Sequence, residues 1–188
     1  MKNVNRCKWC NLKNPVYVKY HDIEWGKPNF TEKYLLEMLI LESFQAGLSW
    51  ECILNKRKDF KKAYDNFNID KICKYDDLKV KELLSNKKII RNKIKISASI
   101  NNAKIFKEIQ NEYGSFHNYL KTFTKDIIVY ELNKTTSPLS DTISIDLKSR
   151  GMKFVGSTII YSYLQAIGVI YSHEEECFLN LKHKFNIM

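Results

Sequence analysis

The sequence predicts a mainly α-helical protein built as one domain. Apolar residues recur at helical spacing over several segments, and short polar links separate these segments. Alternation of apolar and polar residues does not persist long enough to indicate a sheet. With 188 residues, the chain is long enough to bury a core of its own, either as one unit or as two small lobes that share the core.

The beginning of the chain, residues 5–26, shows no period, and we expect a loop there. This segment contains four large aromatic residues, Trp9, Tyr17, Tyr20 and Trp25. So many large rings are rarely left in water. The loop is therefore expected to pack onto the core.

The most apolar stretch of the chain predicts a helix that begins after Thr31 and runs to about Ala46. Thr31 is a suitable N-cap, and Glu32 places a favourable negative charge in the first turn. Residues 34–41 are apolar at nearly every position, whereas a surface helix keeps one polar side. We expect a buried helix that Gly47 ends.

Glu42 lies on the same face of this helix as Met38 and Leu39, because residues three and four apart are neighbours on a helix. A carboxylate is thus carried toward an apolar interior. A buried acid persists when it is paired, protonated or held for a polar ligand, and such groups are candidates for functional sites. The alternative is an acid at the edge of the helix that reaches solvent.

The other elements follow from the same patterns. Helices are expected over residues 52–64, 78–84, 89–109 and 157–168, with a further helix that closes over 146–150 before Gly151; a short extended piece is expected at 127–129, polar links at 66–70 and 85–88, and a loop at 135–141.

Positive charge is concentrated in the middle of the chain. The net charge is +10, and the segment from Lys56 to Lys107 has 16 basic residues against 6 acidic ones, which equals the excess of the whole chain. Such a segment favours a polyanionic partner, usually a phosphate backbone. The alternative is a compositional bias, because the chain is rich in Lys, Asn and Ile throughout.

Cysteine usage and hydropathy indicate a cytoplasmic protein with no membrane partner. The five cysteines are odd in number and unevenly spaced, which argues against a secreted disulfide framework and leaves metal ligation or simple burial. No run approaches the roughly 18 to 20 apolar residues of a membrane span, and the first residues lack the apolar core of a signal peptide.

Both ends of the chain contain residues that bind metals. His173 and Cys177 are four residues apart, so that one helical face would offer both to the same ion. Cys7 and His21 would complete a closed Cys2His2 set for zinc. A rival set takes Cys7 and Cys10 with His173 and Cys177, and a third reading makes all of them ordinary residues near the termini.

Four motifs occur in order along the chain: Tyr-His-Asp-Ile-Glu-Trp-Gly (20–26), Leu-Glu-Ser-Phe-Gln-Ala-Gly-Leu-Ser-Trp (41–50), Ile-Ile-Arg-Asn-Lys-Ile-Lys-Ile (89–96) and Lys-Phe-Val-Gly-Ser-Thr (153–158). Together with the terminal His-x3-Cys, they closely resemble type I 3-methyladenine DNA glycosylases. The resemblance extends over nearly the whole chain. It implies the helix-hairpin-helix glycosylase fold with a zinc site that joins the N- and C-terminal segments.

The resemblance divides the single glycosylase domain, residues 1–188, into two lobes. Residues 1–55 and 135–188 would form a lobe with the zinc site and the pocket, and residues 56–134 a basic helical lobe with the hairpin. It selects as zinc ligands Cys7, His21, His173 and Cys177. Four protein ligands leave no open position for a water molecule, so the zinc is expected to be structural.

Glu42 matches the carboxylate with which the family recognises the base, and Tyr20 would support it. The residues that match aromatic positions in or around the base pocket are Trp50, Tyr17, Trp9, Trp25 and Tyr20. An enzyme that acts on a base in a duplex flips it out and reads it by stacking and hydrogen bonds. In DNA 3-methyladenine is a cation, which an electron-rich ring beside a carboxylate favours.

The resemblance implies monofunctional chemistry. Since the alkylated base is already a good leaving group, positioning and electrostatics can suffice. Glu42 is expected to recognise the base; a general-base role toward water is the alternative, because no catalytic Asp of the superfamily type is evident after the hairpin. No lysine lies in a recognisable nucleophile motif, so lyase activity is not expected.

DNA would be held by the hairpin, where helix-start N–H groups suit a phosphate, with four basic residues nearby, Lys87, Lys88, Arg91 and Lys93. The usual hairpin has glycine, whereas this one has Asn86-Lys87-Lys88, so side-chain charge is expected to replace close backbone approach. Gly47 and Leu48 resemble the segment that fills the gap left by the flipped base. Core packing is the alternative for Leu48.

The expected function is therefore hydrolysis of the N-glycosidic bond of 3-methyladenine in alkylated double-stranded DNA, as in base excision repair, with free 3-methyladenine as product. A monomer is expected. Two alternatives stay open: a zinc-stabilised DNA-binding protein that recognises lesions without cleavage, and a glycosylase with broader specificity that accepts 3-methylguanine or 7-methylguanine.

Overall fold

The computed structural model describes residues 4–180, so the first three and last eight residues of the predicted domain lie outside the description. The described chain is mainly helical, as predicted. Its elements are α1 (Pro15–Ile23), α2 (Glu32–Gln45), α3 (Trp50–Ala63), the 3-10 turn η1 (Asp65–Phe67), α4 (Ile69–Ile72), α5 (Asp77–Ser85), α6 (Lys93–Tyr113), α7 (Phe116–Thr124), β1 (Val129–Tyr130), α8 (Pro138–Ser149), α9 (Ser157–Ala166) and β2 (Ile170–Tyr171). Within this range no helix combines the length and apolar character needed to cross a membrane.

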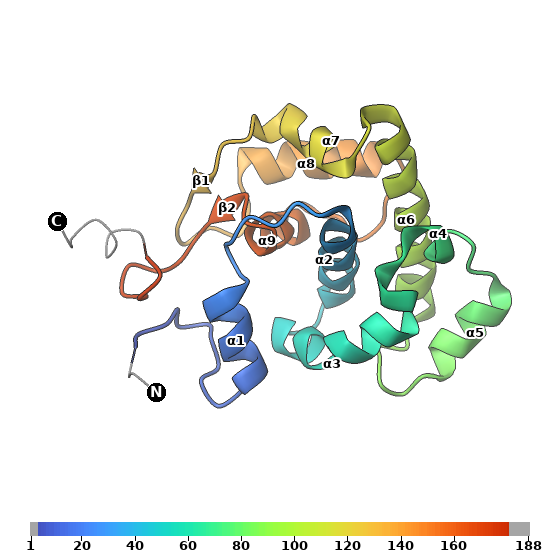
Figure 1. Ribbon diagram of the computed structural model, residues 1–188, viewed down its shortest axis with the longest axis horizontal. Coiled ribbons are helices and arrows are strands. Elements are labelled where there is room, and N and C mark those ends of the chain that lie inside the picture. Colours follow the sequence, from blue (N-terminus) through green and yellow to red (C-terminus); the bar gives the residue numbers. More distant parts are fainter. Residues whose placement is uncertain (1–3, 181–188) are drawn as a thin grey trace.

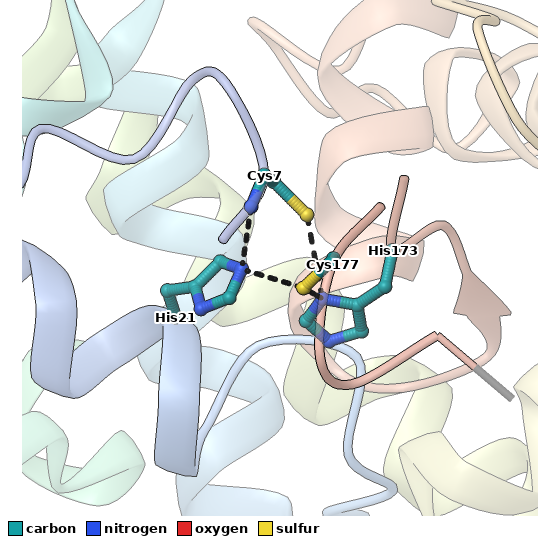
Figure 2. Close-up of side chains that lie close together, drawn as sticks. All are labelled: Cys7, His21, His173 and Cys177. Atoms are coloured by element: carbon teal, nitrogen blue, oxygen red, sulfur yellow. Dashed lines mark hydrogen bonds between the residues drawn. The ribbon is translucent and has the colours of Figure 1, made fainter. Parts of the chain in front are cut away.

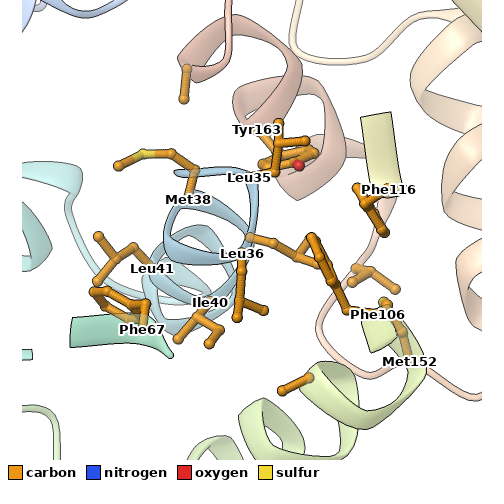
Figure 3. Packing of buried hydrophobic residues seen from close by; sticks show 14 of the residues in the cluster. Leu35, Leu36, Met38, Ile40, Leu41, Phe67, Phe106, Phe116, Met152 and Tyr163 are labelled. Carbon is orange, nitrogen blue, oxygen red and sulfur yellow. The ribbon is translucent and has the colours of Figure 1, made fainter. Parts of the chain in front are cut away.

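Helix α2 lies at the centre of the molecule, where α3, α6, α7 and α9 contact it (Figure 1). Every residue from Tyr34 to Phe44 is buried. Aliphatic side chains leave the helix in all directions to meet partners such as Phe67, Phe106 and Tyr163 (Figure 3). The buried central helix predicted from its uniform hydrophobicity is thus confirmed, and Glu42, at 2% exposure, is carried into the interior with it.

The segment between α5 and α6 differs from the prediction of a helix from Ile89 onward. Residues 86–92 form a turn, here called the hairpin turn, and α6 begins at Lys93. The side chain of Asn92 caps α6 by accepting the Lys95 N–H at 3.1 Å, while Ile89 is buried and holds the turn against the core. The apolar character of Ile89 reflects an anchor in the turn rather than a helical position.

The predicted loop over residues 5–26 is also wrong in part, because residues 15–23 form α1. Asn14 caps this helix with its side chain, and Pro15 occupies the first helical position, where its missing N–H is not needed. Asn-Pro was the signal for a helix start. The aromatic side chains obscured it, since Tyr17 and Tyr20 are buried where a surface helix would be polar.

Three further elements differ from the expectations. Helix α8 begins at Pro138, inside the expected loop at 135–141, because Ser137 and Ser140 form a reciprocal capping box. Helix α7 and the short turns η1 and α4 were not predicted. The extended piece expected at 127–129 overlaps the observed strand β1 only at Val129. β1 pairs in parallel with β2, with Val129 opposite Ile170.

The two ends of the described chain lie side by side (Figure 1). The Phe178 N–H donates to the Asn5 carbonyl at 2.9 Å, and the Lys8 N–H donates to Glu174 at 2.9 Å. The segment after α1 is held against the end of α9, where the Asn29 N–H donates to the Ile167 carbonyl at 3.1 Å. Segments more than a hundred residues apart in sequence thereby meet on one side of α2.

We predict that Gly168→Ala strongly destabilises the fold. Gly168 has a φ of +80°, and a Cβ there would overlap the main chain at Lys27 and Pro28, which cannot yield as a flexible side chain can. The free energy of unfolding in urea should fall by about 3 kcal/mol or more. As a control, Gly156→Ala adds a Cβ where no atom lies within 4 Å, and should change it far less. Equal effects of the two substitutions would contradict the account.

Candidate functional site

Glu42 is the buried acid around which the site is built. Its Oε2 atom is fully buried and has no hydrogen-bond partner in residues 4–180. Burial raises the pKa of Glu42 well above its ordinary value of 4.5, because the charged form loses its hydration. A polar atom kept in this state is expected to meet a ligand, since an unsatisfied buried acceptor costs about 1 to 3 kcal/mol otherwise.

A cavity of about 280 Å³ lies beside Glu42, here called the Glu42 cavity. Its size is close to the lower end of small-ligand sites, about 300 Å³. All five aromatic residues expected around a base pocket line it, and so do other polar side chains; the lining is formed by Trp9, Tyr17, Tyr20, Trp25, Glu42, Gln45, Trp50, Asn133, Lys134, Ser162, Gln165, Ser172 and Glu174. The cavity is therefore an aromatic slot with one buried acid.

Two ring pairs shape the walls of the Glu42 cavity. Tyr20 and Trp50 lie with their ring centroids 5.5 Å apart, and Trp9 and Trp25 form an edge-to-face pair at 4.7 Å. Trp50 Nε1 is buried and has no partner among the described residues, so it too can serve a ligand. The pKa of Tyr20 is raised well above its usual range, by burial first and then by the charge of Glu42. Tyr20 is thus neutral and can donate its hydroxyl proton.

Cys7, His21, His173 and Cys177 form a second group, here called the metal cluster. All four side chains are buried, and their possible ligand atoms lie within 4.8 Å of one another (Figure 2). Each cysteine Sγ is 3.5 Å from His173 Nδ1, and Cys177 Sγ is also 3.5 Å from His21 Nε2. Two thiolates and two imidazoles in such an arrangement can hold one metal ion with a closed shell.

The protonation states of the two histidines also suit metal binding. His21 Nδ1 donates to Asp22 at 2.8 Å, and this leaves Nε2 as the atom that faces the cluster. Arg6 fixes the orientation of Asp22 through two hydrogen bonds of 2.8 and 2.7 Å. Burial lowers the pKa of His173 to about 4, so its imidazole is neutral at pH 7, as ligation requires.

Cys10 does not join the metal cluster, although it is buried at 5% exposure. Of the two ligand sets considered from the sequence, the geometry brings together the one with His21. The reading of these residues as ordinary exposed positions near the termini is wrong, because all four are at most 2% exposed.

Aromatic rings connect the metal cluster to the Glu42 cavity. Trp25 contacts His173 edge-to-face at 4.7 Å, and Trp9 lies 5.2 Å from His21 between ring centroids. Both tryptophans also line the cavity. The cluster is therefore placed to hold one wall of the cavity, which is formed by the two terminal segments.

The residues expected to contact DNA lie on the surface. Gly47, at φ +76°, turns the chain after α2 with open space around it, and Leu48 is 40% exposed, so core packing of Leu48 is excluded. In the hairpin turn and at the start of α6 the basic side chains are exposed, namely Lys87, Lys88, Arg91 and Lys93. The Lys56 ammonium donates to the Lys88 carbonyl at 3.4 Å, so α3 supports the hairpin turn.

Seven residues of the cavity lining were not anticipated from the sequence. One lies beside Glu42, two lie in the loop after β1, and the others lie in or after α9: Gln45, Asn133, Lys134, Ser162, Gln165, Ser172 and Glu174. Only Gln45 gave a signal, through its place in the motif at 41–50. The others are polar residues in unremarkable contexts, and only the fold brings them to the cavity.

Comparison with known proteins gives consistent matches over the chain. The methyladenine glycosylase family matches residues 9–180. DNA-3-methyladenine glycosylase 1 of Escherichia coli strain K12 is 37% identical over 181 residues, which cover 93% of this chain and 96% of that protein.

Solved structures agree with the sequence comparison. A crystal structure of 3-methyladenine DNA glycosylase I matches with a TM-score of 0.89 and 36% identity over 93% of this chain and 99% of that one. A tyrosine-to-phenylalanine variant of 3-methyladenine DNA glycosylase I in complex with 3-methyladenine matches with a TM-score of 0.87 and 30% identity, over 93% of this chain and 96% of that one. With its mainly helical fold and its sequence matched over most of its length, this chain belongs to the methyladenine glycosylase family.

Proposed function

We propose that the protein is a monofunctional DNA glycosylase that hydrolyses the N-glycosidic bond of 3-methyladenine in alkylated DNA. The observation that carries the proposal is Glu42, a buried acid without a partner in residues 4–180 that faces a cavity walled by aromatic rings. Relatives named for this activity and a solved relative that holds 3-methyladenine support it.

In the proposed reaction, the damaged nucleotide leaves the duplex and its base enters the Glu42 cavity. Trp50 stacks on the base, with Tyr20, Tyr17, Trp9 and Trp25 forming the remaining walls. The methylated base is a cation in DNA, so electron-rich ring faces and a carboxylate bind it better than neutral adenine. Glu42 would accept a hydrogen bond from the exocyclic amino group, with Tyr20 beside it, and so select and orient the base.

The chemical step then requires little from side chains. The bonding electrons leave with the base, which departs neutral, so no proton need be supplied to it. A water molecule adds to the cationic sugar carbon and loses one proton to solvent. Positioning and electrostatics provide the rate enhancement. Glu42 acts mainly in recognition of the base. Its burial among aromatic rings argues against a primary role as general base toward water.

The metal cluster is proposed to bind structural zinc, with Cys7, His21, His173 and Cys177 as its four ligands. Zinc bound there would contribute stability and leave no position for a reacting water. By joining the terminal segments, it would hold Trp9 and Trp25 at the cavity.

We also propose how the protein contacts DNA and where it acts. Phosphates would lie on the hairpin turn and its basic side chains, within a basic helical lobe of residues 56–134 that stands beside the lobe with the pocket. Leu48, supported by Gly47, would enter the gap left by the flipped base of double-stranded DNA. We further propose a cytoplasmic monomer that acts in base excision repair.

We predict that Glu42→Gln and Trp50→Ala reduce release of free 3-methyladenine from methylated duplex DNA by about tenfold or more, because each removes a contact worth about 1 to 3 kcal/mol in the transition state. Chromatography of the released bases measures the rate under single-turnover conditions. Glu108→Gln, which removes one exposed acid from α6, is the matched control and should retain the wild-type rate.

The same assay separates the alternatives. Binding to methylated DNA without release by the folded wild-type protein would identify a protein that only recognises lesions and would reject the glycosylase. Release of 7-methylguanine or 3-methylguanine at comparable rates would assign the broader specificity.

A second prediction concerns pH. The raised pKa of Glu42 means that the folded protein holds this proton more tightly than the unfolded chain does. Wild-type stability therefore falls as pH rises from the ordinary pKa of 4.5 toward the raised pKa of the folded protein. The Glu42→Gln variant lacks this titration. Its stability relative to wild type should therefore increase by about 1.4 kcal/mol per pH unit over that interval.

Urea unfolding of both proteins at several pH values between about 4.5 and 7.5 measures this difference. Glu108→Gln should show a constant difference from wild type over the same range. A constant difference for Glu42→Gln would contradict a buried carboxyl with a raised pKa.

A third prediction concerns the metal. Elemental analysis of the purified protein should find one zinc ion per chain, and a strong chelator should lower the Tm, because metal binding to a buried site adds directly to folding free energy. Cys177→Ser should lose both the zinc and the effect of the chelator, whereas Cys52→Ser, which alters a cysteine outside the metal cluster, should keep both. Full stability without metal would reject a structural role.

A further inference from the structure

Lys95 is a buried lysine in the first turn of α6, with 8% of its surface exposed. Its ammonium donates to two main-chain carbonyls, that of Phe44 at 2.8 Å and that of Ala46 at 2.5 Å, and lies 5.9 Å from the centre of the Phe154 ring. Placing a lysine ammonium out of water is costly, and carbonyl dipoles offset that cost only in part. The position calls for an explanation beyond packing.

One carbonyl belongs to Phe44, the penultimate residue of α2, and the other to Ala46, the C-cap of the helix. Between them, the Gln45 carbonyl accepts the Leu48 N–H at 2.6 Å, so that three consecutive carbonyls are fixed. A cation at this end also opposes the negative end of the helix dipole. Lys95 therefore holds the turn that carries Gly47 and Leu48, one helical turn beyond Glu42.

The main chain of Lys95 lies next to the hairpin turn, the segment proposed to contact DNA. Its own N–H is held by Asn92, which directly follows Arg91 in the hairpin turn. Lys95 thus lies between the segment expected to contact a phosphate and the segment expected to enter the duplex. A single side chain connects two elements that are about fifty residues apart in sequence.

We propose that Lys95 is a positioning residue: its ammonium fixes the distance between the hairpin turn and the end of α2, so that Leu48 enters the duplex at the base pair whose base faces Glu42. The proposal rests on the proposed function, because it assigns the residue a part in base flipping. Lys95 does not touch the base. It acts through the main chain of α2.

The test uses a duplex in which a non-cleavable abasic analogue stands opposite 2-aminopurine, whose fluorescence rises when it is unstacked. Wild-type protein should raise the fluorescence as Leu48 enters, and Leu48→Ala should remove most of that rise. Lys95→Met keeps the aliphatic stem without the ammonium, and should lose about as much of the rise as Leu48→Ala. Its single-turnover release of 3-methyladenine should fall about tenfold or more, as for loss of charge-assisted hydrogen bonds.

Binding of free 3-methyladenine distinguishes positioning from a general structural role. All three tryptophans of the chain line the Glu42 cavity, so quenching of intrinsic fluorescence measures this affinity directly. For Lys95→Met it should stay within about twofold of wild type. Lys104→Met removes an exposed lysine from the same helix and should match wild type in every readout.

These measurements test the role of Lys95 separately from the glycosylase activity. Retention of the full fluorescence rise by Lys95→Met, loss of free-base affinity in step with activity, or absence of a rise in wild type would each overturn it. The rise requires no cleavage, so a wild-type protein that inserts Leu48 yet releases no base rejects the glycosylase alone. Should Lys95→Met fail to fold, Lys95→Gln, which keeps one neutral donor, decides by the same readouts.

Discussion

The candidate site depends on an acid that is buried without a hydrogen-bond partner in the described chain. Glu42 lies on a helix covered from all sides, and no side chain within residues 4–180 supplies a hydrogen bond to its Oε2 atom. Such an arrangement opposes folding, so the surrounding packing must sustain it: the contacts of α2 with α3, α6, α7 and α9 provide a rigid frame. The free energy stored in this way is available to a ligand that can satisfy the carboxylate.

The cavity beside that acid requires both ends of the chain. Its walls come from the segment around α1, from the start of α3 and from the residues after α9. The first and the last of these segments are distant in sequence and meet at the metal cluster. Aromatic contacts link the metal cluster to the cavity, since Trp9 and Trp25 each contact a histidine of the cluster and also line the cavity. The stability of the terminal segments and the shape of the cavity therefore depend on the same contacts.

The sequence predicted the helical class, the buried central helix, the acid and aromatic residues of the cavity, and the four residues of the metal cluster. Uniform hydrophobicity made α2 visible, and side-chain types at two ends suggested a shared ion. Where prediction failed, tertiary packing had overridden local pattern: Ile89 anchors a turn, and the aromatic face of α1 hid an Asn-Pro helix start. Polar lining residues such as Ser172 and Gln165 could not be found, because a cavity is formed by the fold and leaves no local period.

The most direct test of the central claim is a pH titration of the Glu42 carboxyl carbon by NMR, assigned by its absence from the Glu42→Gln spectrum. In the free protein, the carboxyl should remain protonated well above its ordinary pKa of 4.5. With 3-methyladenine bound, a hydrogen bond to the charged form should lower that pKa. An ordinary pKa in the free protein, or one that the base leaves unchanged, would contradict the account of a buried acid reserved for the damaged base.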